Sequence, residues 1–362
     1  MRTIFLAIVI AMAVVDSVLA EEPKLLNSIT CDKANIVCGI VFAPGGKNLA
    51  WINGGEPRLW QIGTPKNADN LVVHGVVHRV QAVAFDRAGA MVAFGGFRDG
   101  IGVWNVNSRK RLLVLGSSEH NTHQDADDPF TGMSISFGSD GKSLISCRCN
   151  GGSGVLVETW GLESRKSSRE QLKTKLGGCQ NVTLNPDRTK LAATGFFWAE
   201  YLELFDLTTS KNIATLQGQG NGISDCCFSE NGRLLSVAMD RCVQLWDVAS
   251  KRNVATFQCE AGPSVSTFGI GGKVLAVGDH AREVTLWEVA SRKRMGKIKL
   301  PWNPQSDAYY AVSAVEFSPN GDILAVGQYD GTVTLWETGR FVVAVKATPP
   351  GEVNGKPGNK GE

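Results

Sequence analysis

The chain has 362 residues, more than the roughly 250–300 at which a single hydrophobic core stops growing, so it either splits into domains or grows by repetition. Charged residues make up 20% and the formal net charge is +2, a balance that excludes the broad electrostatic footprint needed for nucleic acid or an acidic membrane surface. The 41 glycines, about 11% against a usual 7% or so, indicate many tight turns.

The first twenty residues have the pattern of a secretory signal peptide. Arg2 precedes an apolar run from Ile4 to Val15, and Val18 and Ala20 supply small residues before Glu21. The run is shorter than the roughly 18 apolar residues of a spanning helix, so a signal peptide is favoured over an uncleaved anchor. The sequence therefore predicts removal of residues 1–20, a mature chain without a membrane span, and a periplasmic or extracellular location.

One pattern recurs from Cys38 onward: a strand ending in Phe, a Gly-containing turn, an apolar strand, a small polar turn and a strand ending in Trp. The clearest copy is the last, AVSAVEFSPNGDILAVGQYDGTVTLWE, from Ala311 to Glu337. The strand-end anchors, which lie about 46 residues apart on average, are Trp60, Trp104, Trp160, Phe205, Trp246, Trp287 and Trp336. The sequence therefore contains seven copies of one structural unit.

Each unit is predicted to be a small antiparallel sheet. Val315 and Phe317, like Val333 and Leu335, alternate with period two, which excludes a helix. A four-stranded sheet has two apolar faces and cannot bury both alone, whereas radial stacking hides them. We expect an all-β, seven-bladed β-propeller of four-stranded antiparallel blades over residues 21–346, followed by a disordered Pro/Gly-rich tail at 347–362.

An outer strand is expected after each anchor, at Lys211–Leu216, Arg252–Phe257 and Arg294–Ile298. In the last blade two segments compete for this slot, Lys24–Ile29 from the start of the chain and Phe341–Val345 from its end. Closing the ring removes an open sheet edge. The sequence leaves open which segment closes it.

Three features resemble WD-repeat proteins: the Phe-Ser-Pro-Asn-Gly turn at 317–321, the Asp330–Gly331 turn and the strand end Leu245-Trp246-Asp247. The resemblance spans about residues 24–346, although only Trp246–Asp247 keeps the Trp-Asp pair and the family's Gly-His dipeptide is absent. The resemblance implies that the N-terminal strand closes the ring. Because the family's histidine is missing, the hydrogen-bond tetrad typical of the family cannot form. We expect four anchors to be buried between neighbouring blades: Trp104, Trp246, Trp287 and Trp336.

Nine cysteines occur without any CxxC or CxxCH motif, which disfavours a haem attachment site and a zinc ribbon. Cys31 and Cys38 bracket a short loop and form the best candidate disulfide. Strand placement makes burial more plausible than metal binding for the cysteines that we expect in the core, Cys147, Cys149, Cys179 and Cys226.

Three insertions lengthen the loops, where function usually resides on a rigid scaffold. One carries imidazoles and carboxylates, GSSEHNTHQDADDPFTG at 116–132, but its spacing matches no metal motif and a solvated acidic loop is favoured. The others are aromatic, GFFWAEY at 195–201 and PWNPQSDAYY at 301–310. In WD-repeat proteins these connections open on one face. The candidate partner-binding residues are Trp198, Tyr201, Trp302, Tyr309, Tyr310, His120, His123 and Asp125.

No acid, base and nucleophile occur at a recognisable catalytic spacing, so the sequence favours a non-enzymatic, extracytoplasmic propeller that binds a protein or peptide on its loop-bearing face. We expect no catalytic residue, cofactor, metal or nucleic-acid partner. The alternative is a propeller enzyme, or a small-ligand-binding protein, that uses the mouth of the central channel.

Overall fold

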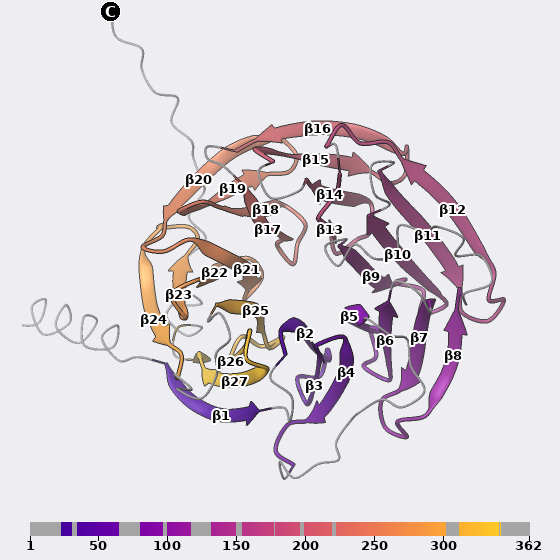
Figure 1. The fold of residues 1–362 in the computed structure, drawn as a ribbon, viewed down its shortest axis with the longest axis horizontal. Coiled ribbons are helices and arrows are strands. Elements are labelled where there is room, and N and C mark those ends of the chain that lie inside the picture. The colour runs from indigo at the N-terminus through magenta and orange to yellow at the C-terminus, as the bar shows by residue number, and fades with distance from the viewer. Residues whose placement is uncertain are drawn as a thin grey trace, which may run out of the picture.

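The computed structural model describes residues 23–30, 35–64, 80–96, 100–116, 132–149, 154–176, 178–195, 199–218, 222–301, 311–339 and 341. In these ranges 27 strands form seven antiparallel sheets around a common axis (Figure 1). Six sheets have four strands, and the first sheet has three among the described residues. The predicted seven-bladed β-propeller is confirmed.

Each blade is a meander in which strands that follow one another in the sequence lie side by side. The first strands are β2 (Val37–Phe42), β5 (Val80–Phe85), β9 (Met133–Phe137), β13 (Asn181–Leu184), β17 (Ile223–Phe228), β21 (Pro263–Gly269) and β25 (Val312–Phe317). The second strands are β3 (Asn48–Asn53), β6 (Met91–Gly96), β10 (Ser143–Cys149), β14 (Lys190–Thr194), β18 (Leu234–Met239), β22 (Val274–Asp279) and β26 (Ile323–Gln328). The third strands are β4 (Glu56–Gln61), β7 (Gly100–Asn105), β11 (Val155–Gly161), β15 (Tyr201–Asp206), β19 (Cys242–Asp247), β23 (Glu283–Glu288) and β27 (Thr332–Glu337). The outer strands are β8 (Arg111–Leu115), β12 (Ser167–Leu172), β16 (Lys211–Gln217), β20 (Arg252–Gln258), β24 (Arg294–Lys299) and β1 (Lys24–Thr30).

The turn between the first two strands explains why the repeat carries Ser, Asn and Gly there. In blade 7 the Gly321 amide donates to the Ser318 carbonyl (2.7 Å), and Gly321 has φ +79°, which a residue with a Cβ adopts only with strain. The Ser318 hydroxyl accepts from the Ile323 amide (2.9 Å) and donates to Asn320 Oδ1 (2.7 Å). These local bonds fix the register of β25 on β26.

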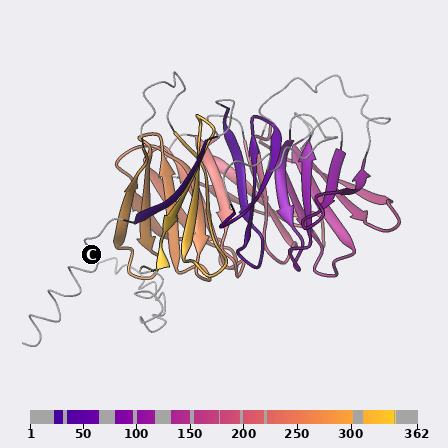
Figure 2. The ribbon, with the colours of Figure 1, turned by 90° about the horizontal axis from the view of Figure 1, so that it is seen from below.

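The antiparallel meander gives the disc two different faces, seen edge-on in Figure 2. Turns from first to second strand and from third to outer strand lie on one side, which we call the hairpin face. Connections from second to third strand, and from each outer strand to the next blade, lie on the other side. We call this second side the insertion face, because β8, β14 and β24 end there just before the three long insertions.

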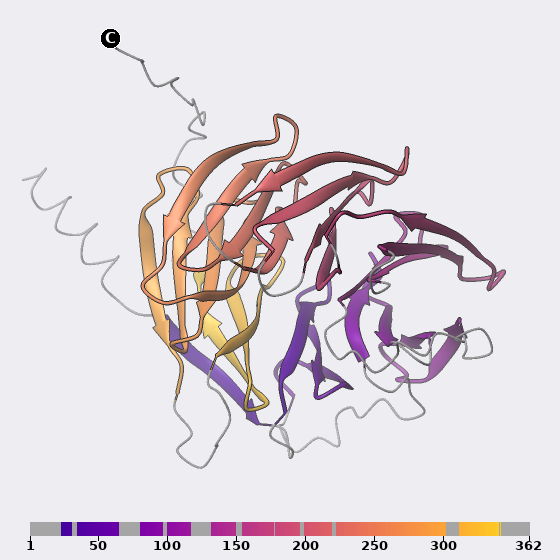
Figure 3. The ribbon, with the colours of Figure 1, turned by 45° about the horizontal axis from the view of Figure 1, so that its top comes forward.

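The ring is closed by β1, which pairs antiparallel with β27 from Lys24–Glu337 to Thr30–Thr332. In Figure 3 the indigo strand β1 lies along the yellow last blade. The competition between the two chain ends is thereby decided in favour of the N-terminal segment. Phe341, from the other candidate segment, is instead buried between blades 6 and 7, where its ring packs near Gly296. Residues 342–345 lie outside the described ranges.

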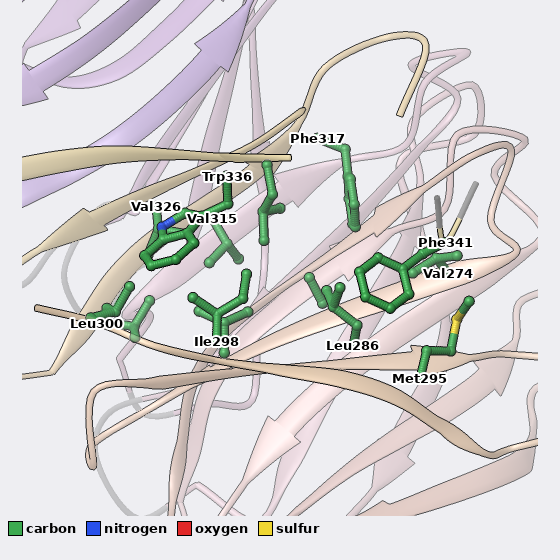
Figure 4. Close-up of a cluster of buried hydrophobic side chains, with 14 residues drawn as sticks. Val274, Leu286, Met295, Ile298, Leu300, Val315, Phe317, Val326, Trp336 and Phe341 are labelled. Carbon is green, nitrogen blue, oxygen red and sulfur yellow. The ribbon is translucent and has the colours of Figure 1, made fainter. Parts of the chain in front are cut away.

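The core consists of seven apolar clusters among the described residues, one between each pair of neighbouring blades. Figure 4 shows the cluster between blades 6 and 7, where Leu286 and Ile298 face Val315, Val326 and Trp336. Because each blade buries one face on either neighbour, no blade has a core of its own. The predicted radial stacking is therefore the main source of stability.

Each anchor residue packs toward the preceding blade. Trp104 and Trp336 are buried, with exposed fractions of 2% and 7%, as expected. Trp246 and Trp287 are only partly buried against their clusters, so the expectation of full burial was wrong for these two. Trp287 packs on Phe257 of blade 5 with ring centroids 5.3 Å apart, and its side chain also lines a groove between blades 5 and 6.

The indole N–H groups show what replaces the family's tetrad. Trp336 Nε1 donates to Thr334 Oγ1 (2.8 Å), two residues earlier on the same strand. The matching position holds Arg58 before Trp60 and Glu158 before Trp160, and those two buried indole N–H groups have no acceptor among the described residues. Each such orphaned donor costs roughly 1–3 kcal/mol. The aromatic anchor therefore recurs in every repeat, whereas the hydrogen bond from its indole N–H does not.

Eight cysteines in the described ranges carry free thiols, and the four expected in the core are all buried, Cys147, Cys149, Cys179 and Cys226. Cys38 is exposed and free, while Cys31, its predicted disulfide partner, lies outside the described residues. Residues 1–20 and 347–362 also lie outside them, so the signal peptide, the propeller's outer limits and the disordered tail stay predictions.

Candidate functional site

The first strands lie closest to the propeller axis, and each contacts the next around the ring (Figure 1). On blades 4 to 7 these strands carry a cluster of buried and partly buried polar groups that no loop insertion contributes. We call it the axial cluster, formed by Asn181, Asp225, Cys227, Thr267 and Glu316.

Asp225 is placed at the third position of β17, immediately after a β-bulge between Ile223 and Asp225. Its carboxylate accepts from Asn181 Nδ2 on blade 4 (3.2 Å) and from the Ser266 amide on blade 6 (2.9 Å). Burial raises the pKa of Asp225 to about 6, and these hydrogen bonds oppose that rise. Asp225 is therefore mostly ionised at neutral pH and links three blades.

Glu316 occupies the fifth position of β25 and accepts from Thr267 Oγ1 on blade 6 (3.2 Å). Burial raises the pKa of Glu316 to about 8, the Thr267 bond opposes the rise, and the Glu230 carboxylate adds to it. At neutral pH most molecules therefore carry a protonated Glu316, which can both donate and accept a hydrogen bond. The axial cluster thus holds one ionised and one neutral carboxyl.

Cys227 lies on β17, two residues after Asp225. Burial raises the pKa of the Cys227 thiol to about 12, and the Asp225 and Glu316 carboxylates add to the rise. A thiol that stays protonated is a poor nucleophile. In the described ranges the one histidine, His280, sits in the turn between β22 and β23, where its amide donates to the Gly262 carbonyl just before β21 (3.1 Å). No three His, Cys, Asp or Glu side chains of these ranges gather as metal ligands do. The cluster's chemistry is hydrogen bonding and attraction of cations.

Of the candidate partner-binding residues, only Tyr201 lies in the described ranges. It begins β15 at the insertion face, is partly buried, and donates its hydroxyl to the Lys175 carbonyl (2.8 Å) in the connection that precedes blade 4. Its polar group is thus used within the chain. The remaining candidates lie outside the described residues: Trp198, Trp302, Tyr309, Tyr310, His120, His123 and Asp125.

A small groove, with a cavity volume of about 40 Å³, lies between blades 5 and 6 and opens to solvent. Trp287 and Thr285 line it from β23, and the Trp287 indole N–H has no acceptor among the described residues. At its rim Lys297 bridges Glu260 (2.8 Å) and Glu283 (2.5 Å), and both carboxylates raise the pKa of Lys297. These ion pairs hold the outer strands of the two blades together across the groove.

Sequence reasoning missed the axial cluster because its members come from four different repeats. A signal was present: the clear repeats place apolar or small residues at the third and fifth positions of the first strand, such as Ala82 and Ala84. Asp225 and Glu316 interrupt that pattern on two of the first strands. Charged residues at these positions of the repeat could have indicated the cluster from the sequence.

Comparison with known proteins supports the fold. The family model described as "WD domain, G-beta repeat" matches residues 210–247 and 304–337. The first range runs from β16 to the end of β19, and the second ends with β27. In the first range the matched repeat therefore begins with the outer strand of blade 4 and ends with the third strand of blade 5.

The chain is also similar to several larger proteins. Over 129 residues it is 30% identical to Pre-mRNA-processing factor 19 of Oryza sativa subsp. japonica, which covers 35% of this chain and 23% of that protein. Over 102 residues it is 28% identical to Pre-mRNA-processing factor 19 homolog 2 of Arabidopsis thaliana, covering 28% and 18%. Over 119 residues it is 28% identical to Transcription initiation factor TFIID subunit 5 of Caenorhabditis elegans, covering 33% and 17%. The matched segments span less than a quarter of each relative.

These relatives overturn the predicted location. They are named for pre-mRNA processing and transcription initiation, which take place inside the cell, so the prediction of a periplasmic or extracellular protein was wrong. The predicted location rested on the residue pattern alone, in which the apolar run after Arg2 was interpreted as an export signal. Within the part of the chain that the structure describes, no helix is long and apolar enough to span a bilayer.

Proposed function

Because this chain is a WD-repeat β-propeller, a fold that serves as a scaffold for protein interactions, we propose that it is a non-enzymatic scaffold that binds a protein or peptide partner on its insertion face. The observation that carries the proposal is topological. Strands β8, β14 and β24 end on this face, so the histidine- and aspartate-bearing insertion and both aromatic insertions leave from the same side of the disc.

The residue types in these insertions suit a partner surface. Trp198, Trp302, Tyr309 and Tyr310 offer large apolar areas with a polar handle, as interface hot spots do. His120, His123 and Asp125 would supply a polar rim. Tyr201 is the last residue of the second insertion, and its hydroxyl donates a hydrogen bond to the Lys175 carbonyl. This bond ties the end of the insertion to the connection that precedes blade 4. We propose that Trp198 and Trp302 are the anchors.

The relatives limit what can be proposed about the function of this chain. Their shared segment is less than a quarter of each protein, so pre-mRNA processing and transcription initiation are not transferred to this chain. A propeller can form one part of a larger assembly. We therefore propose a partner that is itself a protein of an intracellular complex.

The test uses the full chain as bait and compares the wild type with three variants. Trp198→Ala and Trp302→Ala should each weaken the binding of a captured partner by about 2 kcal/mol or more, with an unchanged melting temperature. Leu26→Ala is the control, since Leu26 is 46% exposed on β1, away from the insertions. A partner that binds both Trp variants as tightly as the wild type would refute the insertion face as its site.

The axial cluster favours a second candidate, a small cationic ligand held at the central axis. Asp225 is mostly ionised at neutral pH and accepts two hydrogen bonds, which leaves acceptor capacity on its carboxylate. Calorimetric titration with guanidinium and alkylammonium compounds, on the wild type and on Asp225→Asn, tests it. Equal heats for the two proteins would remove this candidate.

A further inference from the structure

A basic sequence recurs in the turns that join the third and outer strands of blades 2 to 6. These turns are NVNSRKR (105–111), GLESRK (161–166), DLTTSK (206–211), DVASKR (247–252) and EVASRKR (288–294). Their net charge is +7, whereas the whole chain carries +2, so the remainder of the chain is net negative. We call these eleven basic residues the basic rim: Arg109, Lys110, Arg111, Arg165, Lys166, Lys211, Lys251, Arg252, Arg292, Lys293 and Arg294.

The turn geometry is the same from blade to blade. In blades 2, 3, 5 and 6 the amide of the fifth residue donates to the carbonyl of the first, as from Arg109 to Asn105 (2.8 Å) and from Lys251 to Asp247 (2.8 Å). The fifth residue adopts a left-handed φ, +57° at Arg109 and +59° at Lys251, which is uncommon for residues other than Gly. The repeated conformation is followed by one or two basic residues in each of these five blades.

Three of the four carboxylates of these turns, those of Asp206, Asp247 and Glu288, accept hydrogen bonds from residues of their own turn. Asp206 accepts from the Thr208 and Thr209 amides (2.9 and 3.0 Å), and Asp247 accepts from the Ser250 amide (2.8 Å). Within the described residues, by contrast, the exposed side-chain cations of Lys110, Lys166, Arg252 and Lys293 make no hydrogen bond or ion pair. The rim therefore offers cations whose charge is not neutralised within the described chain.

The strands that follow these turns lie at the edges of their sheets, and on two of them a rim cation already bonds the backbone: Lys251 Nζ donates to the Ile213 carbonyl of β16 (2.5 Å) and the Arg292 guanidinium to the Val254 carbonyl of β20 (2.6 Å). Strands β8, β12, β16, β20 and β24 are each the last strand of their sheet. In β12 five of the six residues are exposed, so its backbone lies at the surface. An extended polypeptide can pair with such an edge, whereas a nucleic acid cannot.

We propose that the basic rim binds an acidic, extended polypeptide segment of a partner, with its carboxylates on the rim cations and its backbone along an outer strand. The five turns contain no aromatic residue, so they lack the stacking platform of single-strand nucleic-acid sites. The rim also follows the curved circumference of the disc, so a flat membrane would meet only part of it (Figure 1). This surface is separate from the insertion face.

The test measures fluorescence anisotropy of a labelled peptide of about twelve residues, alternating Glu and Val, at about 50 mM and 200 mM salt. The rim variant replaces Lys110, Lys166, Arg252 and Lys293 by Ala. The control variant replaces four exposed lysines elsewhere, Lys24, Lys173, Lys175 and Lys299, so both lose the same charge. The rim variant should bind about tenfold more weakly and the control less than about threefold, with affinity falling as salt rises.

Three outcomes would overturn the proposal. Equal weakening in both variants would show attraction by net charge alone. Unchanged affinity in the rim variant would place the peptide elsewhere. Tighter binding of an oligouridylate, or of phosphatidylserine vesicles, than of the peptide would assign the rim to nucleic acid or membrane. Because all eight substituted side chains are exposed, melting curves of the three proteins should coincide, and affinities are compared on folded protein.

Discussion

Glu316→Gln should change how the stability of this propeller depends on pH. The pKa of Glu316 is raised from an ordinary 4.5 to about 8, so the folded state binds this proton more tightly than the unfolded chain does. The stabilisation is complete below about pH 4.5 and is lost as pH rises through about 8. The wild type should therefore become less stable between these two values, whereas an amide at position 316 stays neutral throughout.

The size of the effect follows from the same shift. One pKa unit corresponds to about 1.36 kcal/mol, so full burial would give at most about 5 kcal/mol. Glu316 is partly exposed and accepts from Thr267, and solvent screening reduces the expected value to about 2 kcal/mol. The difference in free energy of unfolding, variant minus wild type, should grow by that amount between about pH 5 and pH 9.

Urea denaturation at about pH 5, 7 and 9 measures this difference, and other titrating groups cancel between the two proteins. Glu170→Gln is the control, because Glu170 is exposed on β12 and reports the loss of one surface carboxylate. Asp225→Asn should show the same behaviour in a lower window, between about pH 4 and 6. A difference between wild type and Glu316→Gln that is constant across pH would refute the burial argument for the axial cluster.

Three further experiments test the packing of the blades. Trp104→Ala should lower the free energy of unfolding by about 3–5 kcal/mol and Trp246→Ala by about half as much, because the second ring is only partly buried; equal losses in urea denaturation would contradict this ranking. Gly102→Ala should cost about 2 kcal/mol or more, since the new Cβ would lie 2.1 Å from the Trp104 ring, whereas Gly45→Ala meets nothing within 4 Å; similar melting temperatures would argue against the close contact. Ile29→Asp should cost about 2–4 kcal/mol by placing a charge against the cluster between blades 7 and 1, and a wild-type melting temperature would exclude closure by β1.

The fold could be predicted because the repeat imposes it many times over. Period-two alternation, Gly-bearing turns and evenly spaced Trp residues each point to one antiparallel unit, and the outer strands beginning at Lys211, Arg252 and Arg294 were located to within one residue. The burial of Trp246 could not be predicted in the same way. It depends on the side chains of the preceding blade, which differ from repeat to repeat.

The site was harder to predict because a propeller assembles its axis from residues far apart in the sequence. Asn181 and Asp225 are 44 residues apart, and Thr267 and Glu316 are 49 apart, so no local motif relates them. The loop residues were proposed from composition alone, and Tyr201 is the one that the described structure positions. The prediction of the cellular location was wrong for a different reason, because a short apolar run does not by itself identify an export signal.

Closure by β1 also determines when the ring can close during translation. Lys24 emerges from the ribosome early, but its partner Glu337 is made about 300 residues later, which takes roughly 15–60 s at 5–20 residues per second. Throughout that interval β1 is an unpaired strand with Leu25 and Leu26 available to neighbouring chains. Joining its ends across so long a loop costs about 5 kcal/mol in chain entropy. Translation speed, and any chaperone that shields β1 until the last blade exists, should therefore govern the yield of closed rings more than the stability of any single blade.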